Sequence, residues 1–579
     1  MAYAISKIKR RLVDAVNKAC GQKIADVVDL TVPPNPEMGD FSFACFNLAK
    51  KKKTNPAQIA AELASKIKPD ATLKEIKAVG PYLNFSLQPK KLAQGVLTEV
   101  KESYGQINLG KKKKVIVEYA CPNVNKAFHI GHLRNIVTGE SIIRLLENCG
   151  YKVIRVNYQG DVGMHIAKSV WGILQAEPEF IKIKKESLAK RIAFLGKAYA
   201  AGARAYEENK QAEAEINELN RRLYAQDPAI MPVWKIARQW SLQYFEAIYR
   251  RVRSRFNYYF FESEVAARGV EIVKKNLAKG IFKTSEGAVI FSGGEHGLHD
   301  RVFINSQGFP TYEAKDLALA ENWFKKIKPS LAIHVVGKEQ TEYFKVVFKA
   351  LEYTLPPSKG KERHVAYGWV HLRGGKMSSR LGNVVTGEDL LSVVSGEIKK
   401  LSKTSAVKNK PKLVEEITLA AVKYAMLKGG VEKDIAFDME ESVSLSGNSG
   451  PYLLYTYARI KSIIKKAKKL KSKKTPQDKP TGQAKKQSDF IVRDDEKQLL
   501  LKLALFPEIT QAAAEKYDPS IIAKYLFELA QSFNDYYHRV PVLKAPETER
   551  EFRLALINAI ALVLKKGVEL LGFETVERM

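Results

Sequence analysis

Residues 115–135 read VIVEYACPNVNKAFHIGHLRN and combine a β-rich run, a polar loop and the start of a helix. The helical pattern continues to residue 149, and Gly150 stands where a helix C′ residue belongs. Residues 151–158 are β-rich again. Strand, helix and strand in this order predict a βαβ unit, and therefore a parallel sheet with helices on its faces.

The rest of the chain divides around this unit. Residues 1–108 mix helical patterns with a strand-like run at 82–87, which predicts a small α+β domain. Residues 109–440 are predicted to form the Rossmann-type parallel-sheet domain, with a charge-rich helical insertion at about 165–285. Residues 441–579 predict an all-α bundle. The fold class is therefore multidomain α/β, and further strand-like runs lie at 331–336 and 364–372.

The composition indicates in which compartment the protein works and which class of partner it binds. The 579 residues include 95 Lys and Arg against 63 Asp and Glu, a formal charge of +32, which suggests a polyanion or an acidic membrane surface as partner. No apolar run is long enough to span a membrane, and the N-terminal helix lacks a signal-peptide core, so a cytoplasmic protein is expected. No CxxC pair occurs among Cys20, Cys45, Cys121 and Cys149, which argues against a zinc knuckle. The lysine-rich segment 465–487 predicts either a solvated linker or a basic loop that contacts RNA.

The first candidate site is the start of the helix that follows the first strand. Ligands of open parallel sheets bind at the carboxyl ends of the strands, and a helix N-terminus favours phosphate. Gly131 lets a base or ribose approach the backbone, and His129 and His132 can donate to a phosphate oxygen that gains charge in a transition state. The alternative is two ordinary histidines near a turn.

The second candidate site is the glycine-rich loop 374–383, which reads GGKMSSRLGN. Its charges, Lys376 and Arg380, could close over a triphosphate and stabilise pyrophosphate as it leaves. The alternative is a plain surface loop.

Both motifs resemble signatures of the class I aminoacyl-tRNA synthetases. The His-Ile-Gly-His tetrapeptide matches the first signature, and the loop resembles Lys-Met-Ser-Lys-Ser, although Ser379 stands where most families have a second lysine. The resemblance to arginyl-tRNA synthetases covers nearly the whole chain, in particular residues 117–165, 308–348, 382–389, 447–459 and 571–579. It implies ATP-dependent activation of L-arginine to arginyl-adenylate, followed by transfer to the 3′-terminal adenosine of tRNA(Arg).

The resemblance also implies roles for single residues. The catalytic set is His129, His132, Lys376 and Arg380, and the ATP-binding set is Gly131, His129, His132, Lys376, Met377 and Ser378. The arginine-binding set is Glu118, Asn123, His129, Tyr312, Asp316 and Gln340. The residues 1–108 would meet the tRNA elbow through Tyr82 and Asn84, and the residues 441–579 would read the anticodon, with Tyr452, Tyr455 and Arg459 as candidates. Buried strand or core positions are the alternative for these tRNA candidates.

An arginine substrate also has a physical argument. A guanidinium is planar and always charged, and carboxylates bind it best. Glu118 ends the first strand, while Tyr312 and Asp316 are four residues apart and would share one face of a helix, although that face could simply be solvated.

Substrates and partners follow from the same resemblance. Magnesium is expected with ATP as substrate, and no permanently bound metal is expected. The expected partners are tRNA(Arg), L-arginine and ATP, without a membrane, and the protein is expected to be a monomer. Two other hypotheses are a class I synthetase for another amino acid and a non-catalytic tRNA-binding paralogue.

Overall fold

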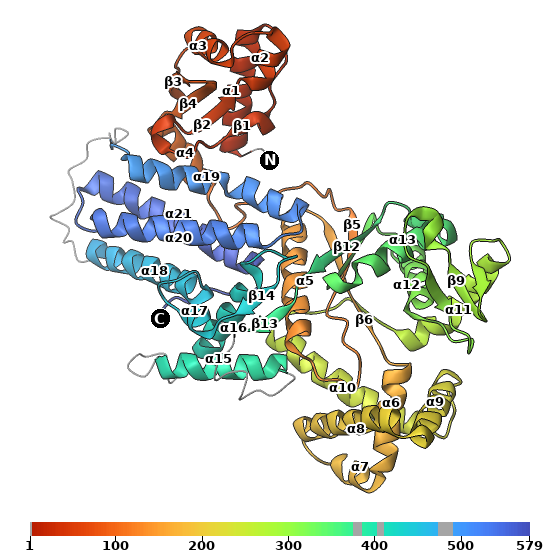
Figure 1. Ribbon diagram of the computed structural model, residues 1–579. Coiled ribbons are helices and arrows are strands. Elements are labelled where there is room, and N and C mark those ends of the chain that lie inside the picture. Colours follow the sequence, from red (N-terminus) through yellow and green to blue (C-terminus); the bar gives the residue numbers. More distant parts are fainter. Residues whose placement is uncertain (1–2, 374–384, 402–409, 473–489) are drawn as a thin grey trace.

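The computed structural model describes residues 3–373, 385–401, 410–472 and 490–579, and the chain is multidomain α/β with a C-terminal helical region (Figure 1). The N-terminal unit is a four-stranded antiparallel sheet in the order β1-β2-β4-β3, packed against helices. Figure 1 shows this unit standing apart from the central sheet and resting on α19. Its elements are α1 (Ala4–Cys20), β1 (Leu30–Thr31), β2 (Phe41–Ala44), α2 (Phe46–Lys52), α3 (Pro56–Lys66), β3 (Leu73–Val79), β4 (Tyr82–Leu87) and α4 (Pro89–Glu99).

The central sheet has five strands in the order β12-β11-β5-β6-β7, and every pair in it is parallel. Its inner strands are rich in Val and Ile and are buried on both faces, as parallel strands require. The predicted βαβ unit is confirmed, with α5 (Ile130–Asn148) crossing between β5 and β6. The strands are β5 (Lys114–Glu118), β6 (Lys152–Gln159), β7 (Tyr258–Phe261), β11 (Leu331–Gly337) and β12 (Glu362–Tyr367).

One predicted strand is wrong in its extent. Residues 364–372 form two strands, because the chain leaves the central sheet after Tyr367 and pairs with a later segment instead. The amide of Gly368 donates to the Val431 carbonyl, and β13 (Val370–Leu372) then forms a separate parallel pair with β14 (Ile435–Phe437). Long-range pairing of this kind leaves no local signal in the sequence.

Helices cover the sheet and extend it on one side. The helices α6–α10 follow β6 and project from the sheet in Figure 1, after which β7 returns to the sheet edge within the range predicted as helical insertion. A small antiparallel sheet, β10-β9-β8, leads into α12. These elements are α6 (Met164–Gln175), α7 (Glu177–Ile183), α8 (Leu188–Glu208), α9 (Lys210–Tyr224), α10 (Met231–Arg251), α11 (Glu262–Leu277), β8 (Lys283–Ser285), β9 (Ala288–Phe291), β10 (Arg301–Ile304), α12 (Tyr312–Lys326) and α13 (Thr341–Thr354).

The C-terminal region is a helical bundle that contacts both other parts of the molecule. Helix α19 packs against α4 and α5, and it carries Glu508 and Lys497, which pair with Lys9 and Asp40 of the N-terminal unit at 2.6 and 2.8 Å. The helices α15 (Gly387–Leu401), α16 (Pro411–Leu427) and α17 (Met439–Val443) lead into this bundle. The bundle itself consists of α18 (Gly450–Ser472), α19 (Asp494–Glu515), α20 (Ser520–Arg539) and α21 (Glu547–Leu570). Among the described residues, none of the helices is long and apolar enough to cross a membrane.

Candidate active site

The N-terminus of α5 holds two stacked histidines. The Nδ1 atom of His129 accepts a hydrogen bond from the Gly131 amide at 3.1 Å, and Nδ1 of His132 accepts from the His129 amide at 3.3 Å. The two rings lie 3.8 Å apart between centroids. Since each Nδ1 is an acceptor, a neutral ring carries its proton on Nε2. Burial lowers the pKa of both imidazoles, that of His132 to about 3, so both are neutral donors at physiological pH.

Gly131 keeps the His129 ring in this position. A Cβ atom at residue 131 would lie 2.9 Å from Cε1 and Nδ1 of His129, which is closer than van der Waals contact allows. The free space in front of the helix is a cavity of about 350 Å³, lined by His129, Gly131, Glu339, Tyr367, Trp369 and Val385 among others. A helix N-terminus that opens into such a cavity is suited to an anion.

The far wall of this cavity is held by one buried guanidinium. Arg134 on α5 donates to the carbonyls of Trp369, Val431 and Lys433 at 2.9, 2.8 and 2.7 Å. These contacts fix the segment between β12 and β13, just before the glycine-rich loop. Four predicted site residues of that loop lie outside the described residues: Lys376, Met377, Ser378 and Arg380.

A group of acidic side chains extends from the carboxyl end of β5 to the start of β12 in the central sheet. Glu118 is the last residue of β5, and it is bonded to His334 on the neighbouring strand β11. The other ring nitrogen of His334 lies 2.9 Å from Oε2 of Glu362 on β12. On α12, Asp316 accepts a hydrogen bond from the Tyr343 hydroxyl at 2.7 Å. Burial and then the nearby Glu118 raise the pKa of Asp316 to about 8.

A buried ion pair between an acidic and a basic side chain lies beside this acidic group. Glu262, the first residue of α11, forms a buried ion pair with Lys315. Gly160 allows Asn123 to approach this pair, because a Cβ at residue 160 would lie 2.1 Å from Asn123 Oδ1 and 3.1 Å from Glu262 Oε1. The Tyr158 hydroxyl, also close to the carboxylates, is buried without a hydrogen-bond partner among the described residues. The site thus holds polar groups that a ligand can satisfy.

The structure brings most of the predicted arginine-binding residues to this part of the molecule. Glu118 and Asp316 lie close together, and Asn123 lies beside Glu262. Tyr312 is 52% exposed, with the Lys315 ammonium 4.7 Å from its ring. Gln340 is exposed, in the short turn that follows β11. The sequence analysis missed His334, Tyr343, Lys315 and Glu262. Their signal lies in strand register and helix packing, which a single sequence does not display.

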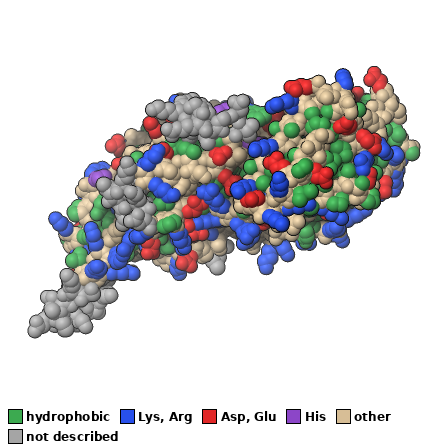
Figure 2. All heavy atoms as spheres, turned by 90° about the horizontal axis from the view of Figure 1, so that it is seen from below, with side chains coloured by type: hydrophobic (Ala, Val, Ile, Leu, Met, Phe, Trp, Pro, Cys, Tyr) green, Lys and Arg blue, Asp and Glu red, His purple; other side chains and the backbone are tan. Residues whose placement is uncertain are grey.

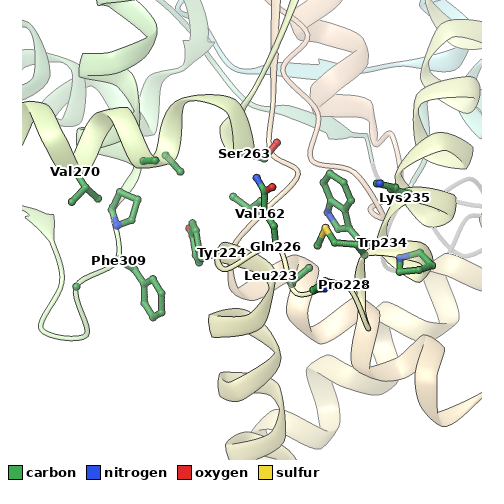
Figure 3. A pocket seen from close by; sticks show the side chains of 16 residues that line it. Val162, Leu223, Tyr224, Gln226, Pro228, Trp234, Lys235, Ser263, Val270 and Phe309 are labelled. Atoms are coloured by element: carbon green, nitrogen blue, oxygen red, sulfur yellow. The ribbon is translucent and has the colours of Figure 1, made fainter.

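A cavity of about 780 Å³ lies next to this group of side chains (Figure 3). Its walls come from the end of α9, the start of α10, the first turns of α11 and the loop before α12. Tyr224 and Phe309 are stacked at 4.9 Å between ring centroids, and the ammonium of exposed Lys235 lies on the opposite side from Phe309 in Figure 3. Tyr224 connects the cavity with the acidic group, because its hydroxyl faces Lys315 while its ring lines the cavity.

The predicted tRNA contacts differ in their accessibility. Tyr82 is 39% exposed and meets the exposed Phe46 ring edge-on at 5.7 Å, whereas Asn84 is only 2% exposed. In the C-terminal bundle Tyr452 is buried and its hydroxyl accepts from Asn534. Arg459 donates to Asn534 and to the Tyr455 hydroxyl at 2.7 and 2.8 Å. The side chains of Arg459 and Tyr455 are partly exposed.

No group of three His, Cys, Asp or Glu side chains that could hold a metal ion occurs in the described parts of the chain. Lysine and arginine side chains are spread along the whole face seen in Figure 2, with acidic residues between them.

Three family models match the chain. Residues 93–439 match the model described as tRNA synthetases class I (R), catalytic domain. Residues 453–579 match the DALR anticodon binding domain, and residues 6–87 match the arginyl tRNA synthetase N terminal domain.

Curated relatives and solved structures agree with these matches. The arginine–tRNA ligase of Treponema denticola is 33% identical, over 97% of this chain and 96% of its own length. That of Halothermothrix orenii is 32% identical over 99% of both chains. Among solved structures, the arginyl-tRNA synthetase of Thermus thermophilus superposes with a TM-score of 0.78 at 26% identity, covering 99% of this chain and all of the other.

Proposed function

The chain belongs to the arginyl-tRNA synthetase family, and from that premise we propose how its residues divide the work of the reaction. Enzymes of this family join arginine to tRNA at the expense of ATP, and the match over the whole chain assigns that reaction here. In the first step the arginine carboxylate attacks the α-phosphorus of ATP and pyrophosphate leaves. In the second step a ribose hydroxyl of the terminal adenosine attacks the adenylate carbonyl.

The buried carboxyl of Asp316 beside Glu118 is the observation that carries the residue assignment. We propose that Glu118 and Asp316 bind the guanidinium, with Tyr312 at the rim and Asn123 near the substrate α-amino group. The support is charge: burial and the nearby Glu118 raise the pKa of Asp316, and its hydrogen bond comes from the neutral Tyr343 hydroxyl, so a guanidinium would supply a cation to this carboxyl. Gln340 and His129 are assigned to the substrate's other polar atoms on family resemblance.

For ATP we propose the cavity in front of α5. The Nε2–H groups of His129 and His132 would donate to phosphate oxygens, and the absent Cβ of Gly131 leaves room for the nucleoside. Lys376, Met377, Ser378 and Arg380 are assigned to the triphosphate by resemblance. Magnesium would enter with ATP as its counter-ion, held by phosphate oxygens.

The tRNA would span the molecule. We propose residues 1–108 as the unit that meets the tRNA elbow, 109–440 as the catalytic domain and 441–579 as the anticodon-binding domain. Tyr82 with Phe46 offers an exposed aromatic surface for an unpaired base, while Tyr455 and Arg459 are the accessible candidates on α18. The aromatic cavity beside the arginine pocket would receive the single-stranded 3′ end. We further propose a monomer that works in the cytoplasm.

The experiment that tests the pocket is steady-state kinetics of Asp316→Ala. We expect a loss of roughly 10–100-fold in kcat/KM for arginine, since a charge-assisted hydrogen bond contributes roughly 1.5–3 kcal/mol. The affinity for tRNA should remain within about twofold because most of the proposed tRNA surface lies on residues 1–108 and 441–579, away from Asp316. Unchanged arginine kinetics would remove Asp316 from the site.

A further inference from the structure

His334 forms a link between two acidic side chains across three strands of the central sheet. The residue lies on β11 directly opposite Glu118 of β5 in the strand register. One ring nitrogen, Nδ1, bonds Glu118 Oε2, and Nε2 lies 2.9 Å from Glu362 Oε2 on β12. All three side chains are at least nine-tenths buried: His334 and Glu118 are 6% and 5% exposed as residues, and the Glu362 side chain is 4% exposed.

We infer that His334 is a positioning residue for amino-acid selection, which acts as a doubly hydrogen-bonded imidazolium and keeps Glu118 charged and oriented for the substrate guanidinium. The inference rests on the proposed role of Glu118. With both carboxylates ionised, the bonding geometry requires the charged ring, because both nitrogens face carboxylate oxygens and only an imidazolium donates from both. A buried carboxylate without a cation would take up a proton instead.

The surroundings of His334 agree with a charged ring. Burial lowers the pKa of His334, but Glu118 and Glu362 outweigh burial and raise it to about 10. The other titratable groups that face it are Asp316 from α12 and His364 from β12. The ring is otherwise enclosed by aromatic side chains: Trp323 on α12 and Phe344 and Phe348 on α13 lie 5.0–5.4 Å from it between centroids. This apolar enclosure leaves the two carboxylates as its hydrogen-bond partners among the described residues.

The two carboxylate oxygens of Glu118 have different partners, and this difference explains how His334 affects the site. Oε2 is taken by His334, while Oε1 has the Cys121 thiol, a weak donor at 3.6 Å, as its hydrogen-bond partner among the described residues. The carboxylate is therefore held through one oxygen, and the second oxygen retains acceptor capacity close to Asp316. A substrate guanidinium can replace the thiol as the stronger partner.

The test is the pH dependence of the arginine KM in His334→Phe, with His334→Gln as a second variant that keeps a neutral donor. Without the imidazolium, Glu118 binds a proton more readily, and arginine binds only after that proton leaves. The ratio of the variant KM to the wild-type KM should therefore be about tenfold or more near pH 6.5 and should shrink as the pH rises. The values of kcat at saturating arginine and of the KM for ATP should change less than about threefold.

A matched control lies on the next strand. His364 is the register partner of His334 on β12, and its ring also packs on Phe344, but it bonds the Val336 carbonyl at 3.1 Å. His364→Gln should leave the KM ratio near one at every pH. A ratio for His334→Phe that is raised but independent of pH would show a packing role and would overturn the inference.

The native protein gives a test that needs no variant. With histidine labelled by ¹⁵N, one imidazole should still show two protonated nitrogens at about pH 8.5, where histidines with ordinary or lowered pKa values are neutral. No imidazolium signal at that pH would overturn the inference even if both variants failed to fold. An enzyme that does not activate arginine at all would instead contradict the proposed function, so the two failures are distinguishable.

Discussion

The arginine pocket depends on single side chains whose charges are coupled. Asp316 lies close to Glu118, and burial together with this neighbour raises the pKa of Asp316 to about 8. A bound guanidinium favours the ionised form of Asp316. Substrate binding and proton release are therefore linked at this residue.

The first prediction concerns this linkage. Below about pH 8 the free Asp316 carboxyl is protonated, and arginine must displace that proton to bind. The arginine Kd should therefore fall as the pH rises, by up to tenfold per unit, and should level off above the pKa of Asp316. Calorimetry in buffers of different ionisation enthalpy should detect one proton released per arginine. A Kd that is flat from about pH 6.5 to 8.5 would contradict the assignment.

The second prediction concerns Gly131. In Gly131→Ala the new Cβ would lie 2.9 Å from the His129 ring, so the ring must turn away from its place in front of α5. We expect kcat to fall by up to ~100-fold, the order of loss that a displacement of about 1 Å causes. Gly196→Ala on α8 is the control, because nothing lies within 4 Å of its added Cβ. Equal kinetics for the two variants would argue against a role of the His129 ring.

At this scale the sequence identifies residues that carry a motif and misses those that depend on packing. His129, Gly131 and His132 are contiguous, so their position at a helix start can be predicted directly. Glu118 can also be predicted, because it ends a strand of the sheet. His334 cannot, since it meets Glu118 only through the register of β11 on β5, and the two are 216 residues apart in the chain.

At the scale of elements, α16 fastens the C-terminal tail to the rest of the molecule. Lys423 on this helix is buried, and its ammonium donates to the carbonyls of Val252 and Gly572 at 2.6 and 2.5 Å. Gly572 lies just beyond α21, so one side chain joins the end of α10, α16 and the last residues of the chain. Burial, and then the nearby Arg144, lowers the pKa of Lys423 to about 7.

The third prediction is the effect of that lysine on stability. The folded-state pKa lies below the unfolded value, so between the two the unfolded chain holds a proton that the folded chain lacks. Raising the pH from about 7 towards 10 should therefore stabilise the wild type relative to Lys423→Met, by up to ~1.4 kcal/mol per unit. Denaturant unfolding across this pH range measures the difference. Lys524→Met, at an exposed position on α20, should show no such slope, and the same slope in both variants would refute the argument.

The elements also show where sequence patterns stop being informative. The βαβ unit and β4 follow local periodicity, and they form close to their predicted bounds. The break between β12 and β13 does not, because it depends on residues 431–437 offering a second pairing partner. The edge strand β7 is also short, and helices precede and follow it in the sequence, so its apolar run resembles part of the helical pattern around it.

At the scale of the molecule, the N-terminal unit is joined to the C-terminal bundle by buried charge. Asp40 is fully buried, accepts from the Leu87 amide at 2.6 Å and pairs with Lys497 of α19. Tyr104, in the connection that follows α4, donates to the Leu503 carbonyl on the same helix at 3.0 Å. The surfaces proposed for the tRNA elbow and the anticodon are therefore held at a set separation by α19.

The fourth prediction tests that coupling. Lys497→Met leaves Asp40 buried without its cation, a change that typically costs about 3–5 kcal/mol. The N-terminal unit should loosen from α19, so the KM for tRNA should rise several-fold while the KM values for arginine and ATP stay constant. Lys502→Met on the same helix is the control, since its ammonium lies 3.9 Å from Glu528 in a partly exposed pair. A tRNA KM that is the same in the two variants would contradict the coupling.

Activation of arginine at the carboxyl edge of the central sheet can be measured by ATP–pyrophosphate exchange with each of the twenty amino acids, with and without tRNA. We expect exchange with arginine alone, and the family resemblance predicts that this exchange needs tRNA. Exchange with a different amino acid, or none with any amino acid in a folded protein that binds tRNA, would contradict this expectation.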